Sequence, residues 1–396
     1  MTKLDKLIQE LCPDGAPFRT IGECVKPIYN IKWSCSNDTE YQYIDLTSVD
    51  RDTHSIGETQ TICADNAPSR AQQIVYAQDI LLGTTRPLLR RFCAVPNEYN
   101  SQICSTGFCV LRADENIVLH RWLYHQISTT KFFDYVEKYQ KGASYPAISD
   151  ADVKKFSIPV PPLPVQREIV RILDNFTELT AELTAELTAR KQQYAYYRDK
   201  LLTMSNEQVA MCNLGDIADI YTGSKPDELL DTISEYEYIN AGTGNSGYTK
   251  QPNCEGDTVT TPSRGQGGIG YVGYQSKPFY LGPLCYAIRS QKQEFIINKY
   301  IYHWLISHSS DILVLKNEGG TPALNKTDLS KIKIKVPSLS VQNRLVDVLD
   351  NFDAICSDLN IGLPAEIEAR QKQYEFYRDK LLSFKKVSTN EQWKEV

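Results

Sequence analysis

The chain contains two copies of one helix-forming segment, and this duplication constrains its fold more than any other feature. The stretch IPVPPLPVQREIVRILDNF at 158–176 aligns without gaps on IKVPSLSVQNRLVDVLDNF at 334–352, with eleven of nineteen positions identical. The stretch ARKQQYAYYRDKLL at 189–202 aligns on ARQKQYEFYRDKLL at 369–382, with ten of fourteen identical. An internal repeat of this strength indicates a molecule built from two equivalent halves.

The match continues more weakly upstream and then stops. Residues 144–156 parallel 320–332, and LYHQIS at 123–128 is similar to IYHWLIS at 301–307. Farther upstream, residues 18–122 and 210–300 share no sequence. They have in common only short strand-like runs and many Gly, Pro, Tyr and Thr residues. Each half therefore predicts one variable α+β domain followed by one retained helix.

The retained segments predict long amphipathic helices, because their apolar residues recur at steps of three, four or seven and Pro-rich stretches precede them. Unbroken helices over 166–202 and 342–382 would each be roughly 55–60 Å long. We expect their apolar stripes to bury one another; packing of each helix on its own domain is the alternative. Gly362 and Pro364 predict a break or kink in the second helix.

A tetrapeptide stutter lies within the first predicted helix. The stretch FTELTAELTAELTAR at 176–190 places Leu179, Leu183 and Leu187 on one helical stripe. We interpret it as a spacer whose length matters, with a simple amphipathic helix carrying a duplication slip as the alternative. In the second helix, which has no such repeat, Leu349 and Phe352 are the predicted coiled-coil residues.

Composition limits the class of protein. A chain of 396 residues with 41% hydrophobic and 23% charged residues is globular and long enough for two or more domains. No apolar run approaches the roughly 20 residues that span a bilayer, and the N-terminus lacks a signal peptide, so we expect a cytoplasmic protein and no membrane. The eleven cysteines have no metal-ligand spacing and predict reduced, mostly buried thiols.

Several motifs that resemble catalytic signatures lack the context that chemistry requires. GQGGIG at 265–270 matches a dinucleotide-binding pattern but continues as strand-like sequence instead of a helix. The Asn-Pro-Pro-Tyr or Asp-Pro-Pro-Tyr motif of amino-methyltransferases is absent, and Asp152 and Lys154 have no further nuclease residues at a suitable distance. The five histidines form no cluster, and the matched positions of His125 and His303 favour packing. We predict no catalytic residue and no metal site.

DNA contact is better supported, although the net charge of −6 argues against coating of nucleic acid by bulk positive charge. GTTRPLLRRF at 83–92 and the glycine-rich TPSRGQGGIGYVGYQSK at 261–277 carry residues able to contact phosphates and base edges. KGASYP at 141–146 and NEGGTP at 317–322 occupy matched places in the two halves. Solvated loops and simple turns are the alternatives. The candidate DNA-binding residues are Thr85, Arg86, Arg90, Arg91, Ser144, Tyr145, Arg264, Gln266, Lys277 and Thr321.

Two dissimilar domains alternating with two similar helices, together with the VPPLPVQREIV, YRDKLL and repeated TAEL elements, resemble the specificity subunit of a type I restriction-modification enzyme of the TAEL-repeat subgroup. The resemblance implies an α+β fold of two target recognition domains separated by two long helices in an antiparallel coiled coil, with an internal pseudo-twofold repeat. The expected parts are an N-terminal helix, a first recognition domain, a central helix, a second recognition domain, and a C-terminal helix with its tail, over 1–17, 18–157, 158–204, 205–333 and 334–396.

The resemblance also implies partners. Each domain would read one half of a bipartite, asymmetric site in double-stranded DNA, while the helices set the gap and dock two methyltransferase subunits. S-adenosylmethionine would belong to the methyltransferase, and ATP and Mg to a restriction/translocase subunit, leaving this chain non-catalytic and without a cofactor in a bacterial or archaeal cytoplasm. The alternatives are the recognition subunit of a related split restriction/modification enzyme and a non-catalytic helical scaffold.

Overall fold

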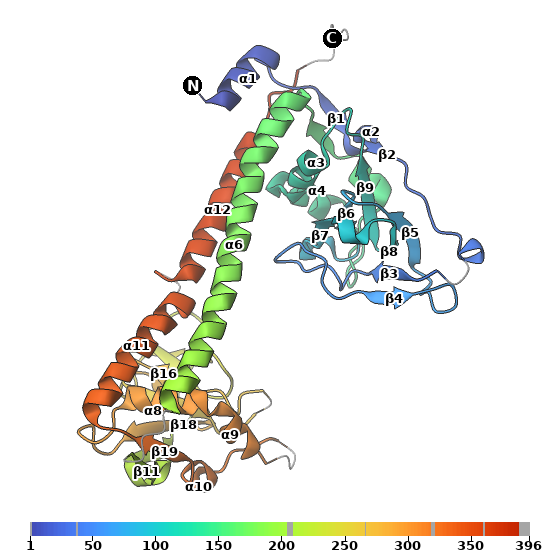
Figure 1. The fold of residues 1–396 in the computed structure, drawn as a ribbon. Helices are drawn as coiled ribbons and strands as arrows, with labels where there is room; N and C mark the ends of the chain where they lie inside the picture. Colours follow the sequence, from blue (N-terminus) through green and yellow to red (C-terminus); the bar gives the residue numbers. More distant parts are fainter. Residues whose placement is uncertain are drawn as a thin grey trace. The chain divides into compact units, whose positions relative to one another are not determined.

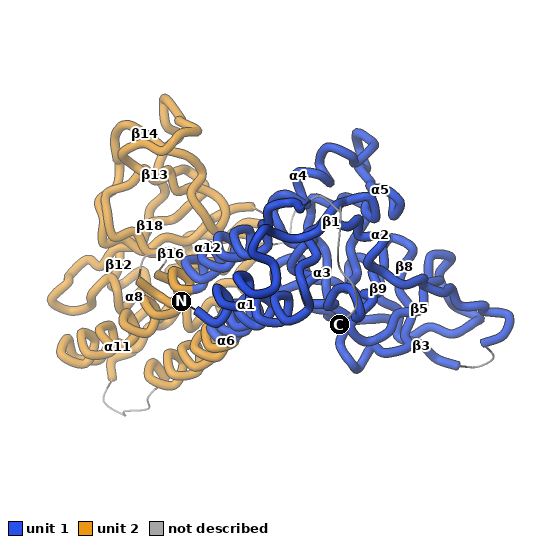
Figure 2. The backbone as a smooth tube through the Cα atoms, turned by 90° about the horizontal axis from the view of Figure 1, so that it is seen from above, with its two compact units in different colours: residues 1–184, 367–396 blue, residues 185–366 orange. Residues whose placement is uncertain are grey.

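A computed structural model describes residues 2–36, 39–203, 209–265, 267–317, 321–358 and 361–387. The chain forms two compact units, shown in separate colours in Figure 2. Unit 1 contains residues 1–184 and 367–396, and unit 2 contains residues 185–366. Each unit holds one variable domain together with parts of both retained segments. Residues 18–157 are called domain 1 below, and residues 205–333 domain 2.

The first retained segment forms one uninterrupted helix and the second forms two (Figure 1). Helix α6 runs over Leu163–Leu202 and includes the whole TAEL stutter, whereas α11, Leu339–Ser357, and α12, Leu363–Leu381, are separate. The predicted break in the second helix is confirmed. A β-carbon on Gly362 would lie 2.6 Å from the Ala354 carbonyl oxygen, and Pro364 has no N–H to continue the preceding helix.

Domain 1 combines two small sheets with a helical layer. A short helix α1, Lys3–Leu11, precedes it. One sheet has the order β2-β9-β6-β7, with the strands Val25–Lys26, Phe108–Ala113, Ile80–Gly83 and Phe92–Ala94. The other has the order β4-β3-β8-β5, with the strands Gln60–Ile62, Tyr41–Ile44, Gln102–Ser105 and Ala71–Val75. The helices are α2, α3, α4 and α5, over Ile21–Cys24, His120–Ser128, Thr130–Tyr139 and Asp150–Lys154, with 3₁₀ turns at Trp33–Cys35, Pro87–Leu89 and Asn97–Tyr99.

Domain 2 repeats this plan. One sheet has the order β12-β18-β15-β16, with the strands Ala218–Thr222, Cys285–Ser290, Thr258–Pro262 and Gly273–Gln275. The other has the order β14-β13-β17, with the strands Tyr248–Thr249, Tyr236–Ile239 and Tyr280–Leu281. The helices are α7, α8, α9 and α10, over Leu214–Ile217, Asn298–Ser307, Ser309–Val314 and Lys326–Leu329.

The two variable domains share the topology of the first sheet despite their unrelated sequences, whereas the second sheet has four strands in domain 1 and three in domain 2. The strand orders of the first sheets correspond one to one, and β3 pairs parallel with β8 as β13 does with β17. An antiparallel strand pair also ties each domain to the start of its retained segment: β1, Phe18–Thr20, with β10, Ser157–Pro159, and β11, Ala210–Asn213, with β19, Lys333–Val336. The α+β prediction is confirmed, and the duplication extends into the framework of both variable domains.

Each hydrophobic core takes side chains from both retained segments. In unit 1, Ile169 and Leu173 of α6 and Leu382 after α12 join the buried cluster around Trp122. In unit 2, the repeat-related Leu349 and Leu202 are part of the corresponding cluster. Leu349, which the sequence assigns to the helix–helix stripe, is 1% exposed within the domain 2 core.

The helices pair antiparallel through two repeat-related aromatic contacts. In unit 1, Phe176 of α6 stacks on Tyr377 of α12, with ring centroids 5.6 Å apart. In unit 2, Tyr197 of α6 stacks on Phe352 of α11 at 6.4 Å. Among the stutter leucines, Leu183 and Leu187 are half-buried and Leu179 is exposed.

Within the described ranges, no helix combines the length and apolar character needed to cross a bilayer. All eleven cysteines are free thiols, and most are buried.

Candidate nucleic-acid interface

In domain 1, the connection between β6 and β7 carries the basic loop. Arg86 and Arg90 flank the 3₁₀ turn Pro87–Leu89, and both have left-handed backbone conformations, with φ of 48° and 54°. Such conformations are costly for non-glycine residues and persist where surrounding contacts fix them. Both arginines are exposed, so this loop presents two cations on a constrained backbone.

The loop lies beside the KGASYP segment. The Arg86 backbone N–H donates to the Pro146 carbonyl oxygen at 2.7 Å, and the Arg86 guanidinium lies 4.6 Å above the Tyr145 ring. Thr85 forms an isolated bridge with Ala147, and Ser144 is exposed next to Tyr145. Four sequence-predicted residues of domain 1 are therefore brought together.

Arg90 and Arg91 point to other partners. The Arg90 guanidinium lies 4.7 Å above the Phe133 ring. The half-buried Arg91 donates to the backbone carbonyl oxygens of Leu46 and Val49 and so holds the β3–β4 connection in place. Arg91, which the sequence predicts as a DNA contact, therefore also supports the fold of domain 1.

In domain 2, the connection between β15 and β16 has the equivalent position. The Gly265 N–H donates to the Pro322 carbonyl oxygen at 3.1 Å, the counterpart of the Arg86–Pro146 bond. Arg264 forms an isolated bridge with Ala323, and both Arg264 and Thr321 are exposed. The predicted Gln266 lies outside the described residues.

The loops chosen in the two halves from composition alone thus occupy one place in a duplicated fold. In both domains the loop between the third and fourth strands of the first sheet contacts the segment that precedes the retained region. The sequences of these loops have nothing in common beyond polar and small residues. The fold presents two different surfaces on the same framework.

Lys277 is separated from the other candidates of domain 2. In the β15–β16 ladder, Thr260 pairs with Gly273 at the end that carries Arg264, and Thr258 pairs with Gln275 at the other end. Lys277 follows Gln275 and is therefore at the end of strand β16 opposite the loop of Arg264. A strand inside the glycine-rich stretch causes this separation.

In each domain a third segment lies beside the basic loop, and it was not identified from the sequence. In domain 1 it is the β3–β4 connection at 45–59, which Arg91 holds and whose His54 ring stacks on Phe92 at 3.9 Å. In domain 2 it is the β13–β14 connection at 240–247, where Gly242 lies against Gly268. Both stretches are rich in Gly, Asn, Asp, Ser and Thr, a composition that marks them as loops and not as neighbours of the basic loops.

His54 is a titratable group of this region with a shifted pKa. Burial lowers the pKa of His54 to about 4, and the nearby Arg90 charge acts in the same direction, against Asp50 and Asp52. Its Nδ1 has no hydrogen-bond partner among the described residues. The His54 ring is therefore neutral at pH 7 and packs as an aromatic ring against Phe92.

The remaining motifs also have defined places. GQGGIG connects the strands β15 and β16 and precedes no helix, which is the wrong context for a dinucleotide site. Asp152 lies in α5 and pairs with Lys155 at 2.9 Å. In the part of the chain that the structure describes, no group of His, Cys, Asp and Glu has a metal-binding arrangement.

His125 and His303 occupy two copies of one buried hydrogen-bonded chain. His125 Nε2 lies 2.8 Å from Asp174 Oδ1, and its Nδ1 lies 2.9 Å from the Tyr374 hydroxyl. In unit 2, the distances from His303 to Asp350 and Tyr194 are 2.8 and 3.4 Å. Each chain joins a domain helix to both retained segments.

In unit 1, this hydrogen-bonded chain has a defined charge state. Burial lowers the pKa of His125, although its hydrogen bond to Asp174 acts in the opposite direction. Burial also raises the pKa of Asp174, but hydrogen bonds from His125 and Arg121 outweigh it and bring that pKa to about 2. A neutral His125 thus donates from Nε2 to an ionised Asp174 and accepts from the Tyr374 hydroxyl at Nδ1.

Two variable domains with corresponding first sheets, alternating in sequence with two retained helical segments, define the architecture. Comparison with known proteins gives its family. The model of the type I restriction modification DNA specificity domain matches residues 27–190 and again 206–369. The type I restriction enzyme EcoR124I/EcoR124II specificity subunit of Escherichia coli is 36% identical over 311 residues, which is 71% of this chain and 74% of that protein. The chain belongs to the type I restriction-modification specificity subunit family.

Solved structures have the same fold. One, described as the structural basis of complex assembly and conformational transition of the type I R-M system, matches with a TM-score of 0.64 and 22% identity over 94% of this chain and 98% of that one. The type I restriction-modification system S subunit from M. genitalium matches with a TM-score of 0.59 and 19% identity over 92% and 96%.

Proposed function

We propose that this chain is the DNA-reading subunit of a type I restriction-modification complex, in which each variable domain reads one half of a bipartite site. The observation that carries the proposal is the repeated loop arrangement, in which Arg86 and Gly265 make the same backbone bond in two domains of different sequence. A conserved framework with divergent polar loops suits two different half-sites in one DNA.

The exposed residues of these loops match DNA in chemistry. Arg86, Arg90 and Arg264 are able to contact phosphates or guanine edges, and Tyr145, 70% exposed beneath the Arg86 guanidinium, offers a ring and a hydroxyl. Ser144 and Thr321 add hydroxyl groups beside them. Local charge of this kind is compatible with the net charge of −6.

The helices are proposed to set the gap between the half-sites. Helix α6 has forty residues without a break, so it extends roughly 60 Å, and its length depends directly on the number of TAEL units. Leu183 and Leu187 of the stutter are half-buried, which suits a helix supported along its length by a neighbour.

The retained helices are also proposed to dock two methyltransferase subunits. Tyr196 of α6 and Phe376 of α12 are repeat-related, and 60% and 62% of their surfaces are exposed. Lys200 and Lys380 lie over these rings at 5.7 and 5.8 Å. One patch presented twice suits two copies of one partner.

In this scheme the chain itself carries out no reaction. S-adenosylmethionine is assigned to the methyltransferase subunits, and ATP and Mg to the restriction/translocase subunits. The contribution of this chain is to select DNA and to position those partners.

The test is a methylation map. The chain is co-expressed with the methyltransferase encoded beside it, and host DNA is sequenced for modified adenines. A two-part motif with a fixed unspecified gap is expected. An assembled complex that methylates no such motif would instead favour a scaffold role.

A further inference from the structure

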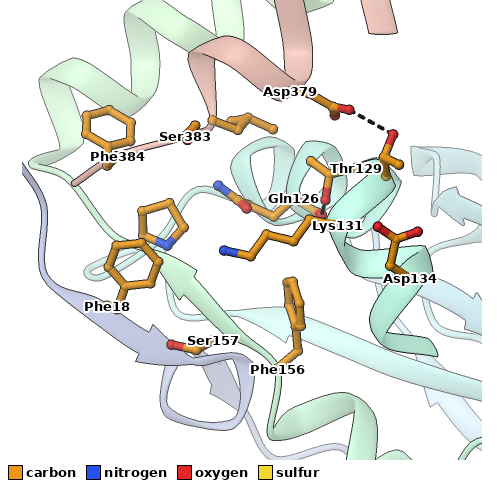
Figure 3. A pocket seen from close by; sticks show the side chains of 13 residues that line it. Phe18, Gln126, Thr129, Lys131, Asp134, Phe156, Ser157, Asp379, Ser383 and Phe384 are labelled. Carbon is orange, nitrogen blue, oxygen red and sulfur yellow. Dashed lines mark hydrogen bonds between the residues drawn. The ribbon is translucent and has the colours of Figure 1, made fainter. Parts of the chain in front are cut away.

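A cavity of about 290 Å³ lies in unit 1 where α12 ends against domain 1 (Figure 3). Its apolar walls include Phe18, Phe156 and Phe384, which come from β1, the turn before β10 and the segment after α12. An engineered cavity of about half this volume holds benzene. The space is therefore large enough for an aromatic side chain.

One polar group at this cavity has no partner. Gln126 of α3 is 3% exposed, and its Nε2 has no hydrogen-bond partner among the described residues. Figure 3 shows the Gln126 amide and the Lys131 side chain directed into the same space. Buried amide groups are nearly always hydrogen-bonded in proteins, so the free Nε2 indicates a missing acceptor.

Domain 2 shows what fills the equivalent space. One residue after the matched histidine, Gln126 is replaced by Trp304, which is buried and donates from its indole N–H to the Lys333 carbonyl oxygen at 3.1 Å. Lys333 is the repeat counterpart of Ser157, which lines the domain 1 cavity. The indole therefore crosses in domain 2 the region that stays open between Gln126 and Ser157 in domain 1.

We propose that this cavity is a socket for a tyrosine side chain of the methyltransferase subunit docked beside domain 1. The ring takes the place that Trp304 fills in domain 2, and the hydroxyl oxygen accepts the hydrogen bond from Gln126 Nε2. Tryptophan offers only a donor at its polar edge, whereas a tyrosine hydroxyl both donates and accepts. The inference rests on the proposed function for the identity of the partner.

The charged groups at the rim suit a neutral occupant. Lys131 and Asp134 have opposite charges on one face of α4. Asp379 accepts hydrogen bonds from the Thr130 hydroxyl at 2.8 Å and from Arg378 Nε at 2.8 Å, so its charge is already compensated. A phenol enters such a rim without bringing an unpaired charge.

The position of the cavity suits a protein partner. It lies at the N-terminal end of α4, while the KGASYP segment of the proposed DNA surface follows the C-terminal end of this ten-residue helix, roughly 15 Å away. Asp379 at the rim is three residues beyond the exposed Phe376 and therefore on the same side of α12. The socket thus continues the proposed docking patch.

The consequence is that two copies of one partner are held differently. The methyltransferase copy beside domain 1 inserts its tyrosine into the cavity. The copy beside domain 2 has no such cavity to enter, because Trp304 fills the equivalent space. Buried aromatic anchors carry a large share of interface energy, so the two sites should differ in affinity.

The first experiment requires no partner. The full chain is titrated with N-acetyltyrosinamide up to about 10 mM, and binding is followed by saturation-transfer NMR. Wild type is expected to bind, and Gln126→Trp, which supplies the plug of domain 2, to bind at least tenfold more weakly. Glu137→Trp adds an indole on α4 away from the cavity and should bind as wild type does. Absence of binding to the wild-type chain, with its fold verified by circular dichroism, would overturn the socket.

The second experiment uses the purified methyltransferase subunit and native mass spectrometry. Gln126→Trp should weaken one of two binding events at least tenfold and leave the other unchanged, with the methylated motif unaltered. Two unchanged events would overturn the socket alone. A wild-type chain that binds N-acetyltyrosinamide but no methyltransferase would overturn the proposed partner and leave the cavity as a ligand site.

Discussion

Arg86 and Arg91 belong to one loop but have different surroundings. The Arg86 guanidinium lies over an exposed tyrosine, while the Arg91 guanidinium donates to two backbone carbonyl oxygens of the β3–β4 connection. Charge density in the sequence predicted both as DNA contacts. Only the fold distinguishes a cation that is available to a ligand from one that is already engaged.

Replacing Arg86 by Ala should therefore weaken binding of the complex to its target duplex roughly tenfold, the loss expected for one arginine contact, with no change in thermal stability. Fluorescence anisotropy on the duplex defined by the methylation map measures this loss. Arg86→Lys keeps the charge and should retain more of the affinity. Unchanged binding by Arg86→Ala would contradict the placement of this loop on DNA.

Arg91→Ala should show the opposite behaviour. It removes charged hydrogen bonds to the Leu46 and Val49 carbonyl oxygens, which should cost about 2 kcal/mol of unfolding free energy. Thermal unfolding of the variant should begin several degrees lower. A variant as stable as wild type would show that the β3–β4 connection needs no such support.

His54 predicts an acid-sensitive domain 1. Its pKa is about 4 in the fold and about 6.5 in an unfolded chain, so the unfolded chain binds more protons between these values. The stabilisation is complete above pH 6.5 and is lost as the pH falls towards 4. Between pH 7 and 5, His54→Phe should lose roughly 5 °C less in melting temperature than wild type does, because Phe keeps the stacking on Phe92 without titrating. Equal losses would assign the acid sensitivity elsewhere.

At the scale of elements, the proposed spacer role makes the length of helix α6 set the gap between the half-sites. Removing Thr184 to Leu187 shortens the helix by roughly 6 Å, and one DNA base pair rises about 3.4 Å. The deletion should keep both half-site sequences and shorten the gap between them by one or two base pairs. Sequencing of methylated adenines in cells that carry the deletion measures the gap directly. A variant that methylates the original motif would contradict the spacer role.

Local patterns predicted the elements that local sequence determines. The retained helices, the break at Gly362 and Pro364, and the two polar loops all follow from repeats, periodicity and turn residues. The common topology of the variable domains did not, because strand pairing joins distant residues and divergent sequences satisfy it equally well. The position of Lys277 was mispredicted for the same reason. The glycine-rich sequence around it suggested one continuous loop with Arg264, but the three-residue strand β16 separates the two residues.

The contacts that cross between the halves were also hidden. His125 and Tyr374 are 249 positions apart, and nothing in either local sequence indicates that they meet. The repeat gives the matched histidines but not their partners. Once the fold is known, the same alignment identifies Tyr194 as the partner of His303.

At the scale of the whole molecule, these crossed contacts predict the behaviour of half a chain. A shortened chain of residues 1–208 retains domain 1 and α6 but lacks the segment that supplies Tyr374 and Leu382. A second copy should supply Tyr194 and Leu202, their repeat counterparts, so the shortened chain should form a twofold dimer. Light scattering after size-exclusion chromatography gives the mass. Leu202→Asp in the shortened chain should prevent dimerisation, and a well-folded monomer without that change would contradict the prediction.

These contacts between residues distant in sequence also determine the order in which the two units are completed during translation. Domain 1 leaves the ribosome first, yet Leu382 of its core and Tyr374 of its buried hydrogen-bonded chain are made after the 182 residues 185–366 of unit 2. At 5–20 residues per second, that delay lasts roughly 10–40 s. The domain that is synthesised first is thus the last to complete its core. Its apolar helix surface stays exposed until the segment with Tyr374 and Leu382 has been made. A premature stop codon near the end of the gene would therefore damage the beginning of the protein.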